Sequence, residues 1–386
     1  MRAFERTHRW LTFQLDLRRS SPQLWLRLGE AQSKCEHIAG TPLKPDVATR
    51  LHQVFLAKGA LATTAIEGNT LTEGEVLQLL AGKLQLPKSK EYLGQEVENI
   101  VSVCNEIAGR LEEADGELTL ERIRAYNRAV LKDLQVPADT APPGETRQYS
   151  VGVGPYRGAP HEDCDHLLER TCAWLNEPEF RPAGDDKIAF AVLRAALAHL
   201  YLAWIHPFGD GNGRTARLVE FFILITAGVP SPAAHLLSNH YNQTRAEYDR
   251  QLRHASSSGG DVLPFVQYAA AGFVDGLRAQ IDEIRAQQWE DAWSNFVDEA
   301  FGIRPSAPEQ RQKALVLALS DRRDWVTTAE IPRLTPDLAA AYATKQAKTI
   351  SRDLNALWAR GLIERASGRV RALRETILAF LPPRKI

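Results

Sequence analysis

Twelve residues near the middle of the chain hold an unusual density of groups that can do chemistry. The stretch H-P-F-G-D-G-N-G-R-T-A-R runs from His206 to Arg217 and contains an imidazole, a carboxylate, an amide, two guanidinium groups and three glycines. An imidazole can take up a proton near neutral pH, and a carboxylate oxygen is a hard ligand that suits Mg²⁺. These residue types together indicate proton transfer beside a bound anion.

The apolar run after the glycines places this group at the start of a helix. R-L-V-E-F-F-I-L-I-T-A-G continues to Gly228, and a helix N-terminus leaves backbone N–H groups unpaired and partly positive. Glycines there let a phosphate approach the backbone, and Arg214 and Arg217 share one helical face. We therefore predict a phosphate cradle, a metal ligand in Asp210 and a general base in His206. The alternative is a glycine-rich loop with a surface histidine and solvated arginines.

Composition bounds the class of protein. The 386 residues are 44% hydrophobic and 25% charged, which is typical of a globular protein with two or three domains. The net charge of −1 gives no global attraction to nucleic acid or membrane, so such contacts need a local patch. We expect no signal peptide and no apolar run long enough to span a bilayer, and the four scattered cysteines favour a cytoplasmic protein. No common zinc spacing joins His161, Cys164, His166 and Cys172, so we expect packing there.

The chain is predicted to be mainly helical. A segment from Asp186 to Trp204 is apolar almost all round, which is typical of a buried central helix, and we expect His199 on it to be a hydrogen-bonded core residue. A long amphipathic helix is predicted over 264–300, ahead of the break R-P-S-A-P. Near residue 150, small residues alternate with Tyr149, Val151 and Val153 as in a short hairpin. The predicted domains are 1–110, 111–300 and 308–386.

The stretch from His206 resembles the signature of the Fic family, HPFx[D/E]GNGRxxR, at every defined position. The resemblance covers roughly residues 60–290 and implies a Fic-type helical core with a short β-hairpin flap. It also implies AMP transfer from ATP to a Ser, Thr or Tyr hydroxyl of a target protein, self-modification included. On this resemblance His206 is the general base, Phe208 a core anchor and Asp210 the ligand of Mg²⁺ between the α- and β-phosphates.

The resemblance also assigns binding residues. Those implied to bind the nucleotide are Gly211, Asn212, Gly213, Arg214, Thr215, Ala216, Arg217, Thr244 and Tyr248, with Arg217 on the γ-phosphate. The implied flap residues are Tyr149, Val151, Gly152 and Val153, which would align a target segment by strand-like pairing. Related Doc-type kinases carry Lys at position 213, so Gly213 favours nucleotidyl transfer over phosphorylation. In the nucleotide-base region the chain departs from the family pattern at His240, Thr244 and Asp249, which leaves a nucleotide other than ATP as an alternative.

An upstream segment, T-T-A-I-E-G-N-T-L-T, resembles the family's inhibitory pattern [S/T]xxxE[G/N] through Thr63, Glu67 and Gly68. A carboxylate brought to the cradle can pair bidentately with Arg217 and occupy the place of a γ-phosphate. We therefore predict an enzyme restrained by Glu67. Taken alone, Glu67 would be an acid on a helix surface.

The segment 308–386 predicts a C-terminal winged helix-turn-helix domain. We expect Thr328 to cap a short helix, Gly361 to end a basic third helix, and Ser367–Gly368 to turn between two strands. Wing arginines Arg365, Arg369 and Arg371 could then meet DNA phosphates. The alternative is a module for protein docking or dimerisation.

Three functions fit the sequence. The first is a protein adenylyltransferase, and the intact His206 favours it because sensing a nucleotide needs no base. The second is removal of AMP, with Glu67 positioning water. The third is a DNA-associated regulator whose Fic site senses the nucleotide. The expected partners are ATP with Mg²⁺, a hydroxyl-bearing protein target, a second copy of the chain and, in one alternative, DNA through 308–386.

Overall fold

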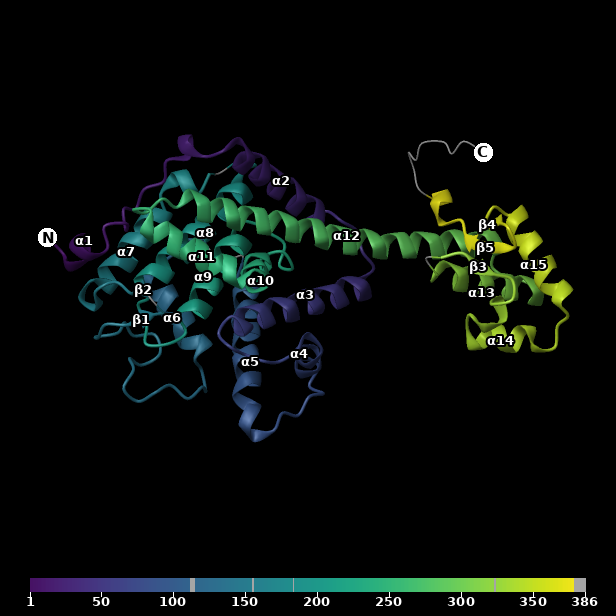
Figure 1. Ribbon diagram of the computed structural model, residues 1–386, viewed down its shortest axis with the longest axis horizontal. Coiled ribbons are helices and arrows are strands. Elements are labelled where there is room, and N and C mark those ends of the chain that lie inside the picture. Colours follow the sequence, from purple (N-terminus) through teal and green to yellow (C-terminus); the bar gives the residue numbers. More distant parts are fainter. Residues whose placement is uncertain (112–114, 155, 183, 323, 378–386) are drawn as a thin grey trace. The chain divides into compact units, whose positions relative to one another are not determined.

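The computed structural model describes residues 1–386 apart from 112–114, 155, 183, 323 and 378–386. The chain is mainly helical and divides into two compact units, Met1–Ile281 and Asp282–Ile386 (Figure 1). The last residues of the predicted C-terminal domain, 378–386, lie outside the described part.

The first unit contains helices α1 to α11, the first half of α12 and one small hairpin. Its helices are α1 (Ala3–Thr7), α2 (Pro22–Ala39), α3 (Pro45–Ala65), α4 (Glu73–Leu80), α5 (Glu91–Gly109), α6 (Leu120–Val130), α7 (Cys164–Leu175), α8 (Lys187–Ile205), α9 (Asn212–Thr226), α10 (Leu236–Gln243), α11 (Arg245–Ser257) and α12 (Leu263–Phe301). Its strands are β1 (Gly152–Val153) and β2 (Tyr156–Arg157), and short 3₁₀ turns cover Leu17–Arg19, Lys88–Lys90, His161–Asp163 and Pro178–Phe180.

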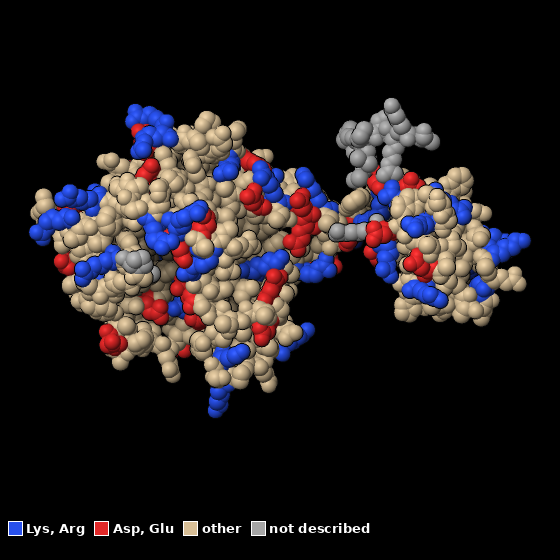
Figure 2. All heavy atoms as spheres, viewed as in Figure 1, with Lys and Arg blue, Asp and Glu red and all other residues tan. Residues whose placement is uncertain are grey.

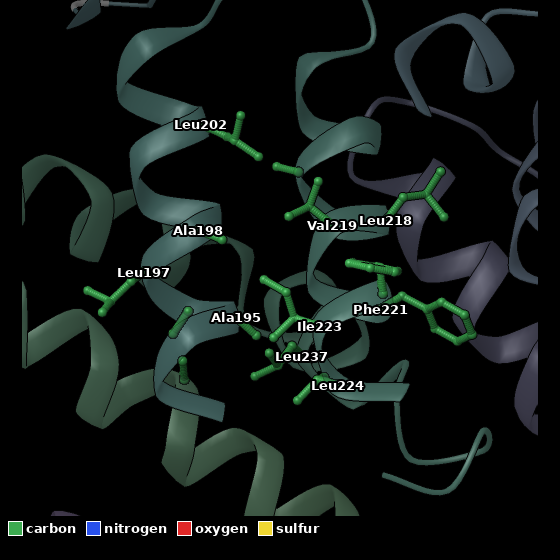
Figure 3. Close-up of a cluster of buried hydrophobic side chains, with 14 of the residues drawn as sticks. Ala195, Leu197, Ala198, Leu202, Leu218, Val219, Phe221, Ile223, Leu224 and Leu237 are labelled. Carbon is green, nitrogen blue, oxygen red and sulfur yellow. The ribbon is translucent and has the colours of Figure 1, made fainter. Parts of the chain in front are cut away.

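Helices α8 and α9 form the centre of this unit because both are apolar on nearly every side. Helix α8 packs against α2, α7 and α9, while α9 also contacts α5 and α6. Figure 3 shows Ala198 and Leu202 of α8 on the side that faces Val219 and Ile223 of α9. Small residues on α8 allow the two helices to approach closely along their length. The predicted central helix and its buried His199 are thus confirmed.

The expectation that no apolar run is long enough to span a bilayer was wrong for α8. Its 19 residues reach a mean hydropathy of 1.8, and by length and composition they could cross a membrane. In the protein 89% of that window is buried, as in the core helix of a globular domain. The reason for its composition is contact with other helices on all sides.

The hairpin is shorter than predicted, and it begins at Gly152 and not at Tyr149, where the alternation of small and apolar residues begins. Gly152 pairs with Arg157 and Val153 with Tyr156 in antiparallel register. One further backbone hydrogen bond, from Gly158 N to the Val151 carbonyl at 3.1 Å, extends the ladder. The Val153 side chain lies outside the described part.

The second unit combines the end of α12 with three further helices and a three-stranded sheet. Its elements are α13 (Ala307–Ser320), β3 (Val326–Thr327), α14 (Pro336–Ala343), α15 (Ala347–Ala359), β4 (Ile363–Ala366) and β5 (Arg369–Ala372), with 3₁₀ turns at Ile331–Arg333 and Arg374–Ile377. The strand order is β3-β5-β4, and all neighbours are antiparallel. Its own core includes Trp293, Leu315, Leu354 and Val370. Ser367 and Gly368, both at positive φ, form the turn between β4 and β5.

The predicted capping role of Thr328 was wrong. The Thr328 hydroxyl donates to the Gly368 carbonyl at 3.5 Å, and the 3₁₀ turn that follows has Glu330 at its N-cap. The helix cap in this region is Thr335, whose hydroxyl accepts from Leu338 N at 3.2 Å at the start of α14. A threonine seven residues further along, directly before Pro336, matches the usual cap-then-proline order.

The surface shows no single-signed field on the face drawn in Figure 2, where basic and acidic side chains are interspersed over the first unit. This agrees with a net charge of −1 and leaves recognition to local groups.

Candidate active site

His206 sits in a strained turn between the two central helices. It is the C-cap of α8 and adopts left-handed backbone angles of φ 49° and ψ 60°, which are uncommon for a residue with a Cβ. Its N–H donates to the Leu202 carbonyl at 2.9 Å, and Pro207 follows. Phe208 is 1% exposed and anchors the next part of the loop, as predicted. The turn thus holds His206 at the end of α8 rather than on its face.

The loop then enters α9 through Gly211 and Asn212. Gly211 has φ 73°, and a Cβ there would lie 3.1 Å from Asn127 Nδ2 and 3.2 Å from Val130 on α6, so the position requires glycine. The Asn212 side chain accepts from Phe208 N and donates to the Phe208 carbonyl, both at 2.9 Å. Asn212 therefore fixes the loop that carries His206 relative to the N-terminus of α9.

A cleft of about 340 Å³ joins this turn to the start of α9. Its lining includes His206, Gly213 and Arg217 from the central segment, Glu67 from the segment after α3, and Tyr156 from β2. The volume is that of a small-ligand site. The fold thus brings segments about 150 residues apart in sequence to one cavity.

Burial and, to a smaller extent, the nearby cation of Arg147 lower the pKa of His206 to about 4. The carboxylates of Glu67 and Asp210 act in the opposite direction. The imidazole is therefore neutral at pH 7 and able to accept a proton.

Glu67 reaches Arg217, as the sequence predicted, but through one nitrogen only. Arg217 Nη2 lies 2.6 Å from Glu67 Oε1 and also donates to the Thr63 carbonyl at 2.9 Å. Among the described residues, Nε and Nη1 of Arg217 have no hydrogen-bond partner although both are buried, so the predicted bidentate pairing was wrong. Burial acts to raise the pKa of Glu67, but its ion pair and hydrogen bond with Arg217 outweigh this and lower it.

The turn that carries Glu67 is held at two further points. Arg245 Nη1 donates to the Ile66 carbonyl at 2.7 Å. Asn69, 6% exposed, donates to the Leu93 carbonyl and to Glu96 Oε2, both at 2.9 Å. Glu67 is thus presented by an anchored turn and not by a free loop.

Glu96 also connects this turn to the start of α9. Its Oε1 lies 2.8 Å from Arg214 Nη1, and Arg214 Nη2 lies 3.3 Å from Asp210 Oδ1. Arg214 is 4% exposed, so its charge is compensated inside the protein. A chain of polar contacts therefore runs from Asn69 through Glu96 and Arg214 to Asp210.

Gly213 is the point of closest approach between Glu67 and the backbone of α9. A Cβ at Gly213 would lie 2.1 Å from Glu67 Oε1 and 3.0 Å from Arg217 Nη1. No side chain fits there while Glu67 is paired with Arg217. The same missing Cβ opens the helix N-terminus to an anion.

The structure gathers part of the predicted nucleotide set around the cleft. Asn212, Gly213, Ala216, Arg217 and Tyr248 line it. Gly211, Arg214 and Thr215 pack behind it and do not belong to its lining. The Thr244 hydroxyl bonds to the His240 carbonyl at 2.7 Å and to the Tyr268 hydroxyl at 2.6 Å, also outside the lining.

The predicted flap residues lie on the segment before and inside the hairpin. The Tyr149 hydroxyl accepts from Ala141 N at 3.1 Å, and Gly152 and Val153 form β1. The hairpin's contribution to the cleft comes from Gly154, at the end of the predicted flap range 147–154, and from Tyr156, which the sequence did not single out.

Other lining residues were missed as well. Tyr156 donates from its hydroxyl to the Trp204 carbonyl at 2.9 Å, and Leu252 and Arg253 come from the far end of α11. An i, i+4 repeat along α11 joins Arg245, Asp249 and Arg253 and could have indicated one polar face toward the site. No comparable sequence signal marks Trp204.

The oxygen ligands near the cleft suit a metal ion that arrives with a bound phosphate better than one held by the protein alone. In the part of the chain that the structure describes, no group of three or more His, Cys, Asp or Glu side chains could hold a metal ion. Asp210, with its side chain 47% exposed, is a single carboxylate at the start of α9. Mg²⁺ commonly binds one or two carboxylates together with substrate phosphates and waters, which fits Asp210. The unpaired nitrogens of Arg217 fit a phosphate in the same way.

The fold and site define a mainly helical protein with a neutral histidine in a cleft beside the N-terminus of α9. Residues 117–224 match the Fic/DOC family. Over this segment the chain is therefore similar to proteins of the Fic/DOC family.

Two curated relatives illustrate the similarity. The chain is 33% identical over 213 residues to protein adenylyltransferase fic-1 of Caenorhabditis briggsae, covering 54% of this chain and 38% of that protein. It is 29% identical over 208 residues to protein adenylyltransferase Fic of Nematostella vectensis, covering 54% of this chain and 44% of that protein. The chain thus spans less than half the length of these relatives.

Solved structures share the fold. A Fic family protein from Desulfovibrio desulfuricans superposes with a TM-score of 0.56 at 20% identity, over 91% of this chain and 96% of that one. A fragment of Fic-1 from Caenorhabditis elegans superposes with a TM-score of 0.52 at 25% identity, over 68% of this chain and 73% of that one.

Proposed function

We propose that this chain is a protein adenylyltransferase that moves AMP from ATP to a hydroxyl side chain of a target protein and is restrained by Glu67. The observation that carries the proposal is the cleft in which His206, the start of α9 and the Glu67–Arg217 pair meet. The relatives named protein adenylyltransferase support the same activity.

In this reaction His206 acts as general base. Its neutral imidazole takes the proton of the target hydroxyl, whose oxygen then attacks the α-phosphorus of ATP. The bond from the α-phosphorus to the bridging oxygen breaks, and pyrophosphate leaves with that electron pair. Burial keeps the imidazole unprotonated at pH 7, so the base is ready before the target arrives.

The start of α9 binds the phosphates. The helix N-terminus and Gly213 would offer backbone N–H groups to the anion, and Arg217 would offer Nε and Nη1, which have no hydrogen-bond partner among the described residues. Asp210 would hold the Mg²⁺ that accompanies ATP, and the ion would neutralise charge on the phosphates. The nucleoside would lie against Tyr248 and Leu252, which also line the cleft.

Glu67 restrains transfer by occupying the anion site. Its carboxylate holds Arg217 at 2.6 Å and covers the backbone at Gly213, where a terminal phosphate would bind. Removal of AMP from a modified target is the reverse use of this site, with Glu67 orienting water.

Transfer of label from α-³²P-ATP with Mg²⁺ to proteins of a cell lysate tests the proposal. We expect weak labelling by the native chain, strong labelling by Glu67→Gly and none by Glu67→Gly with His206→Ala. Equal labelling by the last two variants would remove His206 from the chemistry. If Glu67→Gly instead loses only the ability to remove AMP from a labelled target, the reverse reaction is the main activity.

We further propose that residues 307–377 form a winged helix that binds duplex DNA through α15. Exposed Lys348, Ser351, Arg352 and Asn355 share that helix, and its one acid, Asp353, is buried against Arg311. The exposed side of α15 thus carries cations without a compensating carboxylate of its own. Arg371 is less suited than the sequence suggested, because it pairs with Glu364 at 2.7 Å.

Binding of the full chain to a fluorescent duplex at two salt concentrations tests the second proposal. Charge reversal at Lys348 and Arg352 should weaken binding and flatten its salt dependence by about one unit of slope per lost phosphate contact. Native binding that does not depend on salt, or no binding at low salt, would favour a protein partner.

A further inference from the structure

The guanidinium of Arg147 lies between the histidine turn and the hairpin. Arg147 is 0% exposed and precedes the hairpin in sequence. It donates from Nε to the His206 carbonyl at 2.8 Å and from Nη2 to the Ile205 carbonyl at 3.3 Å. The same group donates from Nη1 to the Tyr149 carbonyl and from Nη2 to the Ala159 carbonyl, both at 2.5 Å. One planar cation therefore binds four backbone oxygens from three places in the chain.

These four oxygens belong to two functional parts. Tyr149 and Ala159 lie before and after the hairpin, so Arg147 closes its base. Ile205 and His206 are the last residue of α8 and its left-handed cap. The hairpin and the base are therefore tied to one side chain.

The backbone around Arg147 strengthens this connection. Arg147 N donates to the Pro207 carbonyl at 2.9 Å, and Thr146 forms a β-bridge with Phe208. There is little room for adjustment, because a Cβ at Gly158 would lie 3.1 Å from Arg147 Nη2 and 3.2 Å from His206 Cβ. A shift of the guanidinium would move the turn, the hairpin or both.

The cation has no ion-pair partner in the described part of the chain. Burial lowers the pKa of Arg147, which reflects the cost of placing a charge away from water. Four carbonyl dipoles compensate that cost, and a planar fork with five donors is needed to reach them together. Lysine keeps the charge but cannot reproduce the fork.

We propose that Arg147 is a positioning residue that sets the His206 turn and the target-binding hairpin as a single unit. The inference rests on the proposed AMP transfer, in which the target hydroxyl must meet both the hairpin and the base. A target segment aligned on the hairpin is then automatically in register with His206. Loss of the fork would separate the two without removing either.

The charged groups that face His206 are Arg147, Glu67 and Asp210. Arg147 opposes protonation of the imidazole, while the two carboxylates favour it. Removing the cation should therefore raise the His206 pKa, and replacing it with lysine should not. A higher His206 pKa in the methionine variant but not in the lysine variant would show loss of the charge, and a general loosening of the fold would not produce that difference.

The test uses Arg147→Lys and Arg147→Met in the Glu67→Gly chain, with Arg194→Lys as the matched control. Arg194 is also buried, at 4% exposed, and its Nη2 binds the Gly116 carbonyl at 2.9 Å and Asn176 Oδ1 at 2.7 Å. We expect kcat for transfer to fall on the order of a hundredfold in Arg147→Met and tenfold in Arg147→Lys, because misplacement by about 1 Å has such effects. The Kd for ATP should stay within about twofold, since Arg147 does not contact α9, and the control should transfer normally.

A second measurement does not depend on AMP transfer. Titration of the His206 ring by NMR, without nucleotide or metal, should give the same pKa in Arg147→Lys as in the Glu67→Gly parent and a higher pKa in Arg147→Met. Native transfer by Arg147→Lys, or an equal loss in Arg194→Lys, would overturn the proposal. So would an unchanged His206 titration in a folded Arg147→Met chain. If Arg147→Met does not fold, the kcat of Arg147→Lys decides. If Glu67→Gly itself transfers no label, the proposed function fails, and the titration still tests the coupling.

Discussion

Replacing Glu67 with glycine should raise AMP transfer on the order of a hundredfold. Glu67 Oε1 lies 2.6 Å from Arg217 Nη2 and only 2.1 Å from the place of a Cβ on Gly213. Glu67 thus fills the space beside Gly213 and Arg217 that the proposed function gives to the terminal phosphate, so ATP would have to bind with that phosphate displaced. An error of about 1 Å in a reacting geometry costs on the order of a hundredfold in rate.

The assay is the initial rate of label transfer from α-³²P-ATP at saturating Mg²⁺ to a protein acceptor identified from the lysate. Glu67→Gln is the informative companion, because it keeps the size of the side chain but loses its charge. The transfer rate of Glu67→Gln should rise less than that of Glu67→Gly, because its side chain still fills the space beside Gly213. Glu98→Gln, an exposed acid on α5, serves as the control and should leave the rate unchanged.

A variant at Arg217 tests whether Glu67 restrains AMP transfer by pairing with this arginine. Arg217→Ala should lower transfer, and the double variant with Glu67→Gly should resemble Arg217→Ala, because no arginine remains to be released. The two changes should thus be strongly non-additive. A hundredfold gain from Glu67→Gly in a chain that already lacks Arg217 would refute competition for this arginine. An unchanged rate in Glu67→Gly would refute restraint altogether.

Three other predictions concern His206, Glu96 and Asp353. In Glu67→Gly, protonation of His206 should not reduce kcat/KM between pH 8 and 6. Its pKa is already lowered to about 4, and removal of the Glu67 carboxylate lowers the pKa further. A rate profile in which kcat/KM falls by half near pH 6.5 would contradict this. Glu96→Gln should raise basal AMP transfer about tenfold, because the turn that carries Glu67 loses a charged hydrogen-bond partner. Glu98→Gln is the control and should have no effect. In a chain that already carries Glu67→Gly, Glu96→Gln should give no further gain. Asp353→Ala should destabilise the second unit by about 3 kcal/mol in urea unfolding, and an unchanged midpoint would show that its buried contacts are dispensable.

The sequence predicted the helix that begins at the glycines and the buried helix before it because the relevant physics is local. Glycines before an apolar run determine how α9 begins, and an apolar pattern on all sides determines that α8 is buried. His206 and Arg217 lie within one such segment, so their proximity needed no tertiary information. The same holds for the turn at Ser367–Gly368, where a Ser-Gly pair stands between two apolar stretches and both residues adopt positive φ.

What the sequence did not predict depends on contacts between distant segments. Arg147 reads as an ordinary charged residue before a hairpin, and only the fold shows that it is buried against Ile205 and His206. Glu96 on α5 gives no local sign that it joins Asn69 to Arg214. The hairpin was placed too early because alternation of small and apolar residues does not fix a register, whereas the ladder from Gly158 to Val151 does.

Gly213 shows why local and long-range information both matter at this site. Its position at the start of α9 already explains a glycine, because an anion must approach the backbone there. The fold adds a second reason, since Glu67 Oε1 fills the space that a Cβ would take. On the proposed function, the carboxylate and the phosphate would use the same gap and the same arginine, and they could not do so together. Restraint would then need no separate regulatory site, because the gap that suits a phosphate at the start of α9 also holds the Glu67 carboxylate.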